Sequence, residues 1–168
     1  MSKTVLVYGL IIGALSAGTM FFSIHTMRGG NVRTSEVLGY TSIVLAMLLV
    51  FFGIRSYREN AGGGKVTFLR GLGVGVAITL IASGCYVATW QAMYFSTPGL
   101  GDQLAACMVD HATASGATPE QVDAVTQQTE SYKKLWANPL TNAAVTFLEP
   151  FPVGVAAALI SAAVLRKR

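Results

Sequence analysis

Hydrophobic positions along the chain are gathered in four long runs that are separated by polar connections. The runs cover residues 5–24, 37–54, 72–95 and 140–165. Each approaches or exceeds the roughly 20 apolar residues that an α-helix needs to cross a hydrocarbon core of about 30 Å. Because lipid offers no hydrogen-bonding partners, the backbone polar groups of such runs must be satisfied within helices. The pattern therefore predicts an all-α fold, an integral membrane four-helix bundle formed by residues 1–168 as a single membrane domain.

The connection between the third and fourth runs, residues 96–139, contains two further helical patterns. Leu104, Met108 and His111 recur at helical spacing, and Gly116 is placed to end the first of these helices. Residues 118–136 continue with a second helical pattern. We therefore expect a helical extracytoplasmic loop on top of the bundle.

The second loop helix has a clear start signal. Thr118 is expected to be its N-cap, Pro119 its first residue and Gln121 the partner that completes a capping box. Tyr132 and Trp136 follow on one face, where they suit the lipid headgroup region. Two roles remain open for this loop: a cap packed on its own bundle, or a binding surface for a partner.

Composition agrees with a membrane location. Hydrophobic residues make up 52% of the chain, and the mean hydropathy of +0.53 is too high for a soluble domain of this size. The net charge of +4 does not indicate nucleic-acid binding, because the basic residues lie at the ends of the apolar runs. The expected partner is the lipid bilayer, with no nucleic acid.

The distribution of Lys and Arg predicts the orientation. Eight of the 12 basic residues lie at the two termini and in the connection after the second run. These are Lys3, Arg55, Arg58, Lys65, Arg70, Arg166, Lys167 and Arg168. Since cytoplasmic loops carry the excess of positive charge, we expect a multi-pass protein with both termini in the cytoplasm.

Small residues at four-residue spacing predict where the helices approach one another. Such spacing lets helix backbones come close in lipid, where no hydrophobic force drives helices together. The helix-packing positions expected from it are Gly9, Gly13, Gly71, Gly75 and Gly154.

A candidate functional polar cluster is expected in the outer half of the bundle. It consists of Glu149, Glu36, His25 and Gln91. Glu149 lies inside the fourth run and is followed by Pro150 and Pro152, which lack backbone N–H groups and should kink the helix. Glu149 has two interpretations: a structural carboxyl group, neutral or paired with His25 or Arg28, or a carboxylate that responds to protons or cations.

The sequence does not support enzymatic chemistry. His25, Glu36 and Glu149 lack the fixed spacing of a metal site, so we predict no metal ligands. Residues 62–65 fail as a phosphate loop because Val66 follows Lys65 where Ser or Thr is needed. We expect no catalytic residues and no cofactor.

Three segments together resemble a known family. They are 35–40 continuing to 51–58, then 138–140, and then 146–154. The chain resembles the four-span bacterial membrane proteins grouped as the domain of unknown function 4199 family. That resemblance implies an integral protein of the bacterial cytoplasmic (inner) membrane, from an uncharacterised protein family with no family mechanism to carry over. In that family an acid commonly follows the tryptophan matching Trp90, whereas this chain has Gln91, which weakens the case for an acidic cluster.

Two hypotheses for function follow. The first is a non-enzymatic structural or accessory membrane protein, with a second copy of itself or another membrane protein as partner. The alternative is a small proton- or cation-coupled transporter or channel-like protein that uses Glu149 in a kinked fourth helix. The chain is short and shows no inverted repeat, which favours the first hypothesis.

Overall fold

The computed structural model describes residues 2–28 and 32–166, with side-chain surroundings for residues 3–26 and 37–166. These described residues form seven helices. They are α1 (Ser2–Arg28), α2 (Val32–Asn60), α3 (Phe68–Ser96), α4 (Leu100–Ala114), α5 (Pro119–Ala137), α6 (Pro139–Leu148) and α7 (Pro150–Leu165).

Within the described residues, four stretches are long and apolar enough to cross a membrane: Lys3–Thr26, Val37–Asn60, Phe68–Ser96 and Pro139–Leu165. The last of these comprises α6 and α7, which meet at Glu149. The predicted all-α membrane bundle with four spans is therefore confirmed.

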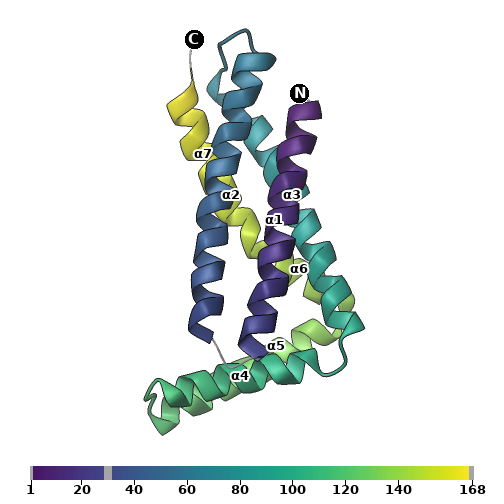
Figure 1. The fold of residues 1–168 in the computed structure, drawn as a ribbon, viewed down its shortest axis with the longest axis vertical. Coiled ribbons are helices and arrows are strands. Elements are labelled where there is room, and N and C mark those ends of the chain that lie inside the picture. The colour runs from purple at the N-terminus through teal and green to yellow at the C-terminus, as the bar shows by residue number, and fades with distance from the viewer. Residues whose placement is uncertain (1, 29–31, 167–168) are drawn as a thin grey trace.

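Helices α1, α2, α3 and α7 run roughly along the long axis of the molecule, α6 is inclined to it, and α4 and α5 lie across one end (Figure 1). The two chain ends lie at the opposite end, together with the connection between α2 and α3. We call this second end the terminal end, and the end covered by α4 and α5 the capped end.

Small residues produce close helix contacts around α3, the helix that packs against α1, α2 and α7. A Cβ atom built on Gly13 of α1 would lie 2.5 Å from the Cβ of Cys85 in α3. One on Gly75 of α3 would lie 2.6 Å from the Cβ of Ala158 in α7. The predicted packing positions Gly9, Gly71 and Gly154 also face neighbouring helices, at Ile81, Ala162 and Thr79 respectively.

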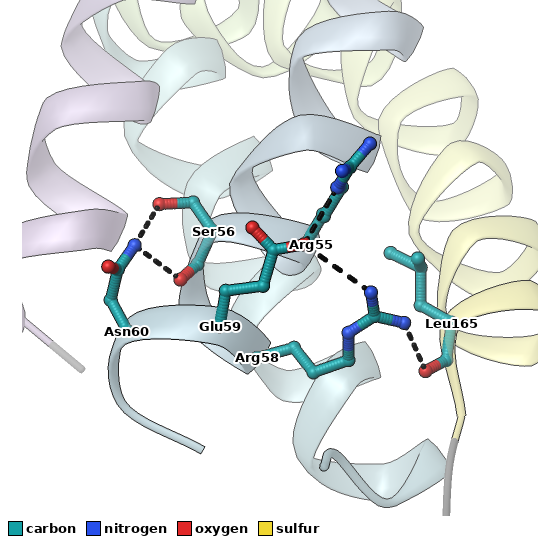
Figure 2. Close-up of polar contacts among 6 residues, drawn as sticks. All are labelled: Arg55, Ser56, Arg58, Glu59, Asn60 and Leu165. Carbon is teal, nitrogen blue, oxygen red and sulfur yellow. Dashed lines mark hydrogen bonds and ion pairs between the residues drawn. The ribbon is translucent and has the colours of Figure 1, made fainter. Parts of the chain in front are cut away.

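A polar network joins α2 to α7 at the terminal end (Figure 2). Arg58 of α2 reaches across to α7 and donates from Nη1 to the carbonyl oxygen of Leu165 at 3.4 Å. Arg55 pairs with Glu59 at 2.9 Å on the same helix. Because the last carbonyls of a helix have no intrahelical donor, Arg58 supplies one for the end of α7.

The loop prediction of two helices is confirmed by α4 and α5. Gly116, with φ +79°, lies between them in the left-handed conformation that glycine adopts readily. Thr118 and Gln121 form the predicted capping box at the start of α5. Both helices are thus specified by local signals in the chain.

The cap packs on its own bundle. Leu100 and Leu104 of α4 are buried against Met20 and Ile24 of α1. Trp136 of α5 makes a second contact, with Trp90 of α3. Of the two roles considered for this loop, the structure therefore shows packing against its own spans.

Candidate functional site

A cavity of about 450 Å³ lies between the helices of the bundle, beneath the cap, and is partly open to the surface. Its walls come from α1, α2, α3 and the start of α7. Leu104 and Met108 of α4 and Trp136 of α5 border it at the capped end. Ile12, Val50 and Thr79 border it toward the terminal end.

Small side chains help to leave this volume open. Gly39 lies on the cavity wall in α2, and a Cβ atom built on it would meet nothing within 4 Å. Ser16, Ser42 and Ala46 also line the wall. The helices therefore have little side-chain volume here with which to fill the space between them.

Hydroxyl groups of three helices border the cavity, and those of two threonines are occupied within their own helices. The Thr19 hydroxyl donates to the carbonyl oxygen of Leu15 at 3.1 Å, and that of Thr79 to Gly75 at 2.9 Å. Ser83 of α3 differs, because its hydroxyl is buried and has no hydrogen-bond partner among the described residues. Buried polar groups are rarely left in this state.

Glu149 brings a carboxyl group to the same cavity. It lies at the junction of α6 and α7, and its side chain remains accessible. The Tyr86 hydroxyl of α3 donates to Glu149 Oε2 at 3.2 Å. Because Pro150 and Pro152 have no backbone N–H, the regular helical bonds to the carbonyls of Thr146 and Leu148 cannot form, and the helix is interrupted beside the carboxyl group.

Aromatic rings form the wall next to the cap. Trp90 of α3 and Trp136 of α5 both line the cavity, with ring centroids 5.6 Å apart in an edge-to-face arrangement. Tyr132 stacks on Trp136 at 5.5 Å. The Trp90 Nε1–H group is buried and unpaired among the described residues, which leaves a donor without an acceptor on this wall.

A buried amide holds Trp136 in position. Asn142 of α6 is fully buried, and its Nδ2 donates to the carbonyl oxygen of Trp136 at 3.0 Å. Thr146 donates to the Asn142 side-chain oxygen at 3.3 Å. The end of α5 is thereby tied to the fourth span at the border of the cavity.

Comparison with known protein families identifies the chain. It matches, over residues 7–167, the family described as "Protein of unknown function (DUF4199)". The chain belongs to this family. Neither the comparison with curated proteins nor that with solved structures gave a match.

Within this DUF4199 fold, the segment 146–154 that carried the resemblance borders the cavity. It contributes Glu149, Pro150, Val153 and Gly154 to the wall. The interrupted helix and the carboxyl group are therefore part of one local feature of the chain.

The four members of the predicted polar cluster lie in different surroundings. Glu149 borders the cavity, whereas Gln91 donates from Nε2 to the carbonyl oxygen of Pro139 at 2.7 Å. His25 lies on an exposed face of α1, and no hydrogen bond or ion pair joins it to Glu149. The side chains of Glu36 and Arg28 are outside the described residues.

Tyr86, Ser83 and Trp90 are site residues that the sequence analysis did not single out for the cavity. They lie on one face of α3, because they follow one another at spacings of three and four residues. This periodicity was present in the sequence as a polar stripe on an apolar helix. Among the described residues, no group of three or more His, Cys, Asp or Glu side chains is placed to hold a metal ion.

Proposed function

We propose that this DUF4199 protein is a non-enzymatic membrane protein that binds a small amphipathic molecule in the cavity beneath its cap. The cavity carries the proposal. Its volume of about 450 Å³ falls in the range of about 300–1,000 Å³ that small-molecule sites occupy. Its walls are mainly apolar, with a few polar groups on α3 and at the junction of α6 and α7, which is the usual composition of such sites.

We also propose that the protein lies in the cytoplasmic membrane of a bacterium, with both termini and the α2–α3 connection in the cytoplasm. The support is the excess of basic residues at the terminal end, which follows the positive-inside rule. A C-terminal green fluorescent protein fusion should fluoresce and a C-terminal alkaline phosphatase fusion should be inactive. The reverse result would place the termini outside.

Both tryptophans of the chain line the cavity, so intrinsic fluorescence reports directly on its contents. Neopentylbenzene, a neutral apolar probe, would be titrated into the protein in dodecyl maltoside micelles. We expect a saturable change in tryptophan emission and a rise in melting temperature.

A matched pair of glycine variants tests whether the probe enters the cavity. Gly39→Phe places a ring on the cavity wall and should abolish the saturable change. Gly18→Phe adds the same ring at an exposed position outside the cavity, where a Cβ also meets nothing within 4 Å, and should bind as wild type. Equal binding by both variants would overturn the proposal, as would a wild type that binds neither this probe nor its cationic counterpart benzyltrimethylammonium.

A transport role is the second candidate, favoured by the accessible carboxyl group beside an interrupted helix. Proton and cation flux into liposomes would be compared between wild type and Glu149→Gln. Flux above that of empty liposomes, lost in the variant, would support transport. If neither wild type nor Glu149→Gln gives flux, and both are folded and inserted, the transport role is disfavoured. The protein would then act as an accessory protein that binds a small molecule, either alone or together with a second copy or another membrane protein.

A further inference from the structure

We propose that the ligand of this cavity is an organic ammonium ion with apolar substituents, held by the Glu149 carboxylate and the ring faces of Trp90 and Trp136. This inference rests on the proposed function, since it names the chemical class of the molecule that the cavity binds. Three features of the cavity wall support it: its charge, its aromatic rings and its apolar lining.

The first feature is a carboxyl group without a counter-charge. Among the cavity-lining residues that the structure describes, Glu149 is the acidic one, and none is Lys, Arg or His. Its hydrogen bond from Tyr86, at 3.2 Å, is the single polar contact found for it within the described side chains. A carboxylate has about four acceptor sites, so one hydroxyl leaves most of its capacity unused.

The position of Glu149 makes this unused capacity important. Glu149 lies ten residues after Pro139, between the two helices of the span Pro139–Leu165, and thus away from both ends of the span. A carboxylate within a membrane span is rarely left without a partner. The accessible side of Glu149 therefore suits a cationic group that enters from the cavity.

The second feature is the aromatic wall. Tyr86 contacts Glu149, Trp90 follows Tyr86 by one helical turn, and Trp136 lies 5.6 Å from Trp90 between ring centroids. The faces of such rings attract ammonium groups within about 6 Å, and more strongly where water is excluded. A carboxylate and two indole rings that border the same cavity are complementary to an alkylated ammonium group.

The third feature is the lining of the rest of the cavity, which separates an organic cation from an inorganic one. Met20, Ile24 and Ile43 border the cavity and suit apolar substituents. Glu149 is the one carboxylate among the described lining residues, and no cluster of three metal-ligating side chains occurs in the described part of the chain. A divalent metal ion would find a single carboxylate and otherwise neutral hydroxyls here, which is a weak set of ligands.

Two probes of the same shape test the charge directly. Benzyltrimethylammonium and neopentylbenzene differ in a nitrogen cation that replaces a neutral carbon. Both would be titrated in dodecyl maltoside micelles with tryptophan emission as the readout, after correction for partition into protein-free micelles. We expect the cation to bind wild type at least ten-fold more tightly than its neutral counterpart.

Variants assign this preference to Glu149. Glu149→Gln removes the charge and keeps the size of the side chain, and it should reduce the preference for the cation over neopentylbenzene at least ten-fold. Glu120→Gln makes the same change at an exposed residue of α5 outside the cavity and should retain the preference. Circular dichroism and gel filtration in the same detergent test that Glu149→Gln folds.

The failure of this inference can be told apart from failure of the proposed function. Equal affinity of wild type for the two probes, or an unchanged preference in Glu149→Gln, would overturn the ammonium ligand while the cavity still binds neopentylbenzene. Tighter binding of the neutral probe would point to an uncharged ligand and also overturn it. If wild type bound neither probe, and so behaved as Gly39→Phe is expected to behave, the proposed function itself would be overturned.

Discussion

A Cβ atom on Gly75 would lie 2.6 Å from the Cβ of Ala158, whereas one on Gly39 would meet nothing within 4 Å. Gly75 faces α7 from the first part of α3, near the connection between α2 and α3. Gly39 lies on the wall of the cavity, beneath the cap. The same residue type therefore permits close contact in one half of the bundle and leaves space in the other.

The difference shows how the two halves are stabilised. In lipid, helices associate through close van der Waals packing and polar contacts, and the terminal half uses small residues for this purpose. The capped half is held together from its border, by the aromatic rings of Trp90 and Trp136 and by the buried amide of Asn142. A cavity can persist there because the cap and α6 fix the helix ends.

The largest expected effect comes from filling the close contact. Gly75→Val should lower the free energy of unfolding by about 3 kcal/mol, since Ala158 cannot move away without shifting α7. Gly39→Val, the matched control, should change it by less than about 0.5 kcal/mol because its surroundings are open. Unfolding in mixed micelles followed by circular dichroism measures both, and equal losses would contradict the distinction between the two halves.

Removing the buried amide should weaken the capped half next. Asn142→Ala leaves the Trp136 carbonyl without its donor and should cost about 2 kcal/mol. Trp136 emission should shift as the ring loses its fixed position, while the contacts of Gly75 remain. The measurement is a denaturant titration followed by tryptophan fluorescence, and an unchanged midpoint would show that the hydrogen bond from Asn142 does not help to hold the cap.

A smaller effect is expected at the start of α5. Thr118→Ala removes the hydroxyl oxygen that accepts a hydrogen bond from the backbone N–H of Gln121, and it should destabilise the start of α5 by about 1 kcal/mol. Hydrogen exchange should accelerate in the first turn of α5 and stay unchanged in the spans. Thr118→Ser keeps the hydroxyl and should behave as wild type; faster exchange in both variants would argue against the capping box.

The smallest effect is expected for the ion pair between α4 and α5. Lys133 Nζ lies 2.7 Å from Asp102 and 3.0 Å from Glu130. The hydrogen bond to Asp102, followed by that to Glu130, raises the pKa of Lys133 above its ordinary value of 10.5. A raised pKa stabilises the fold below the unfolded-state pKa, and this contribution is lost as the pH rises through the folded-state pKa.

Lys133→Gln should therefore lower the melting temperature slightly, by the same amount at every pH from about 7 to about 10. The exposed pair is screened by ions, so the difference should shrink in about 1 M salt. A difference that grows with salt, or that varies within this pH window, would exclude the ion pair as its cause.

Local physical chemistry was sufficient to predict most of the helices. Hydropathy over about 20 residues located the four spans, the Thr118–Gln121 box located the start of α5, and Pro150 located the interruption at Glu149. Each of these signals acts between residues that are close in the chain. None requires knowledge of which helix lies beside which.

The cavity and its contacts depended on the relative rotation and tilt of the helices. Tyr86 contacts Glu149, which is 63 positions away in the sequence, and Trp90 of α3 contacts Trp136 of the cap. Gly39 faces open space. Hydrophobic periodicity carries little information about such pairings, because in lipid every face of a span can be apolar. Packing between small residues sets the rotation of each helix, so only the assembled bundle brings the carboxyl group, the rings and the empty volume together.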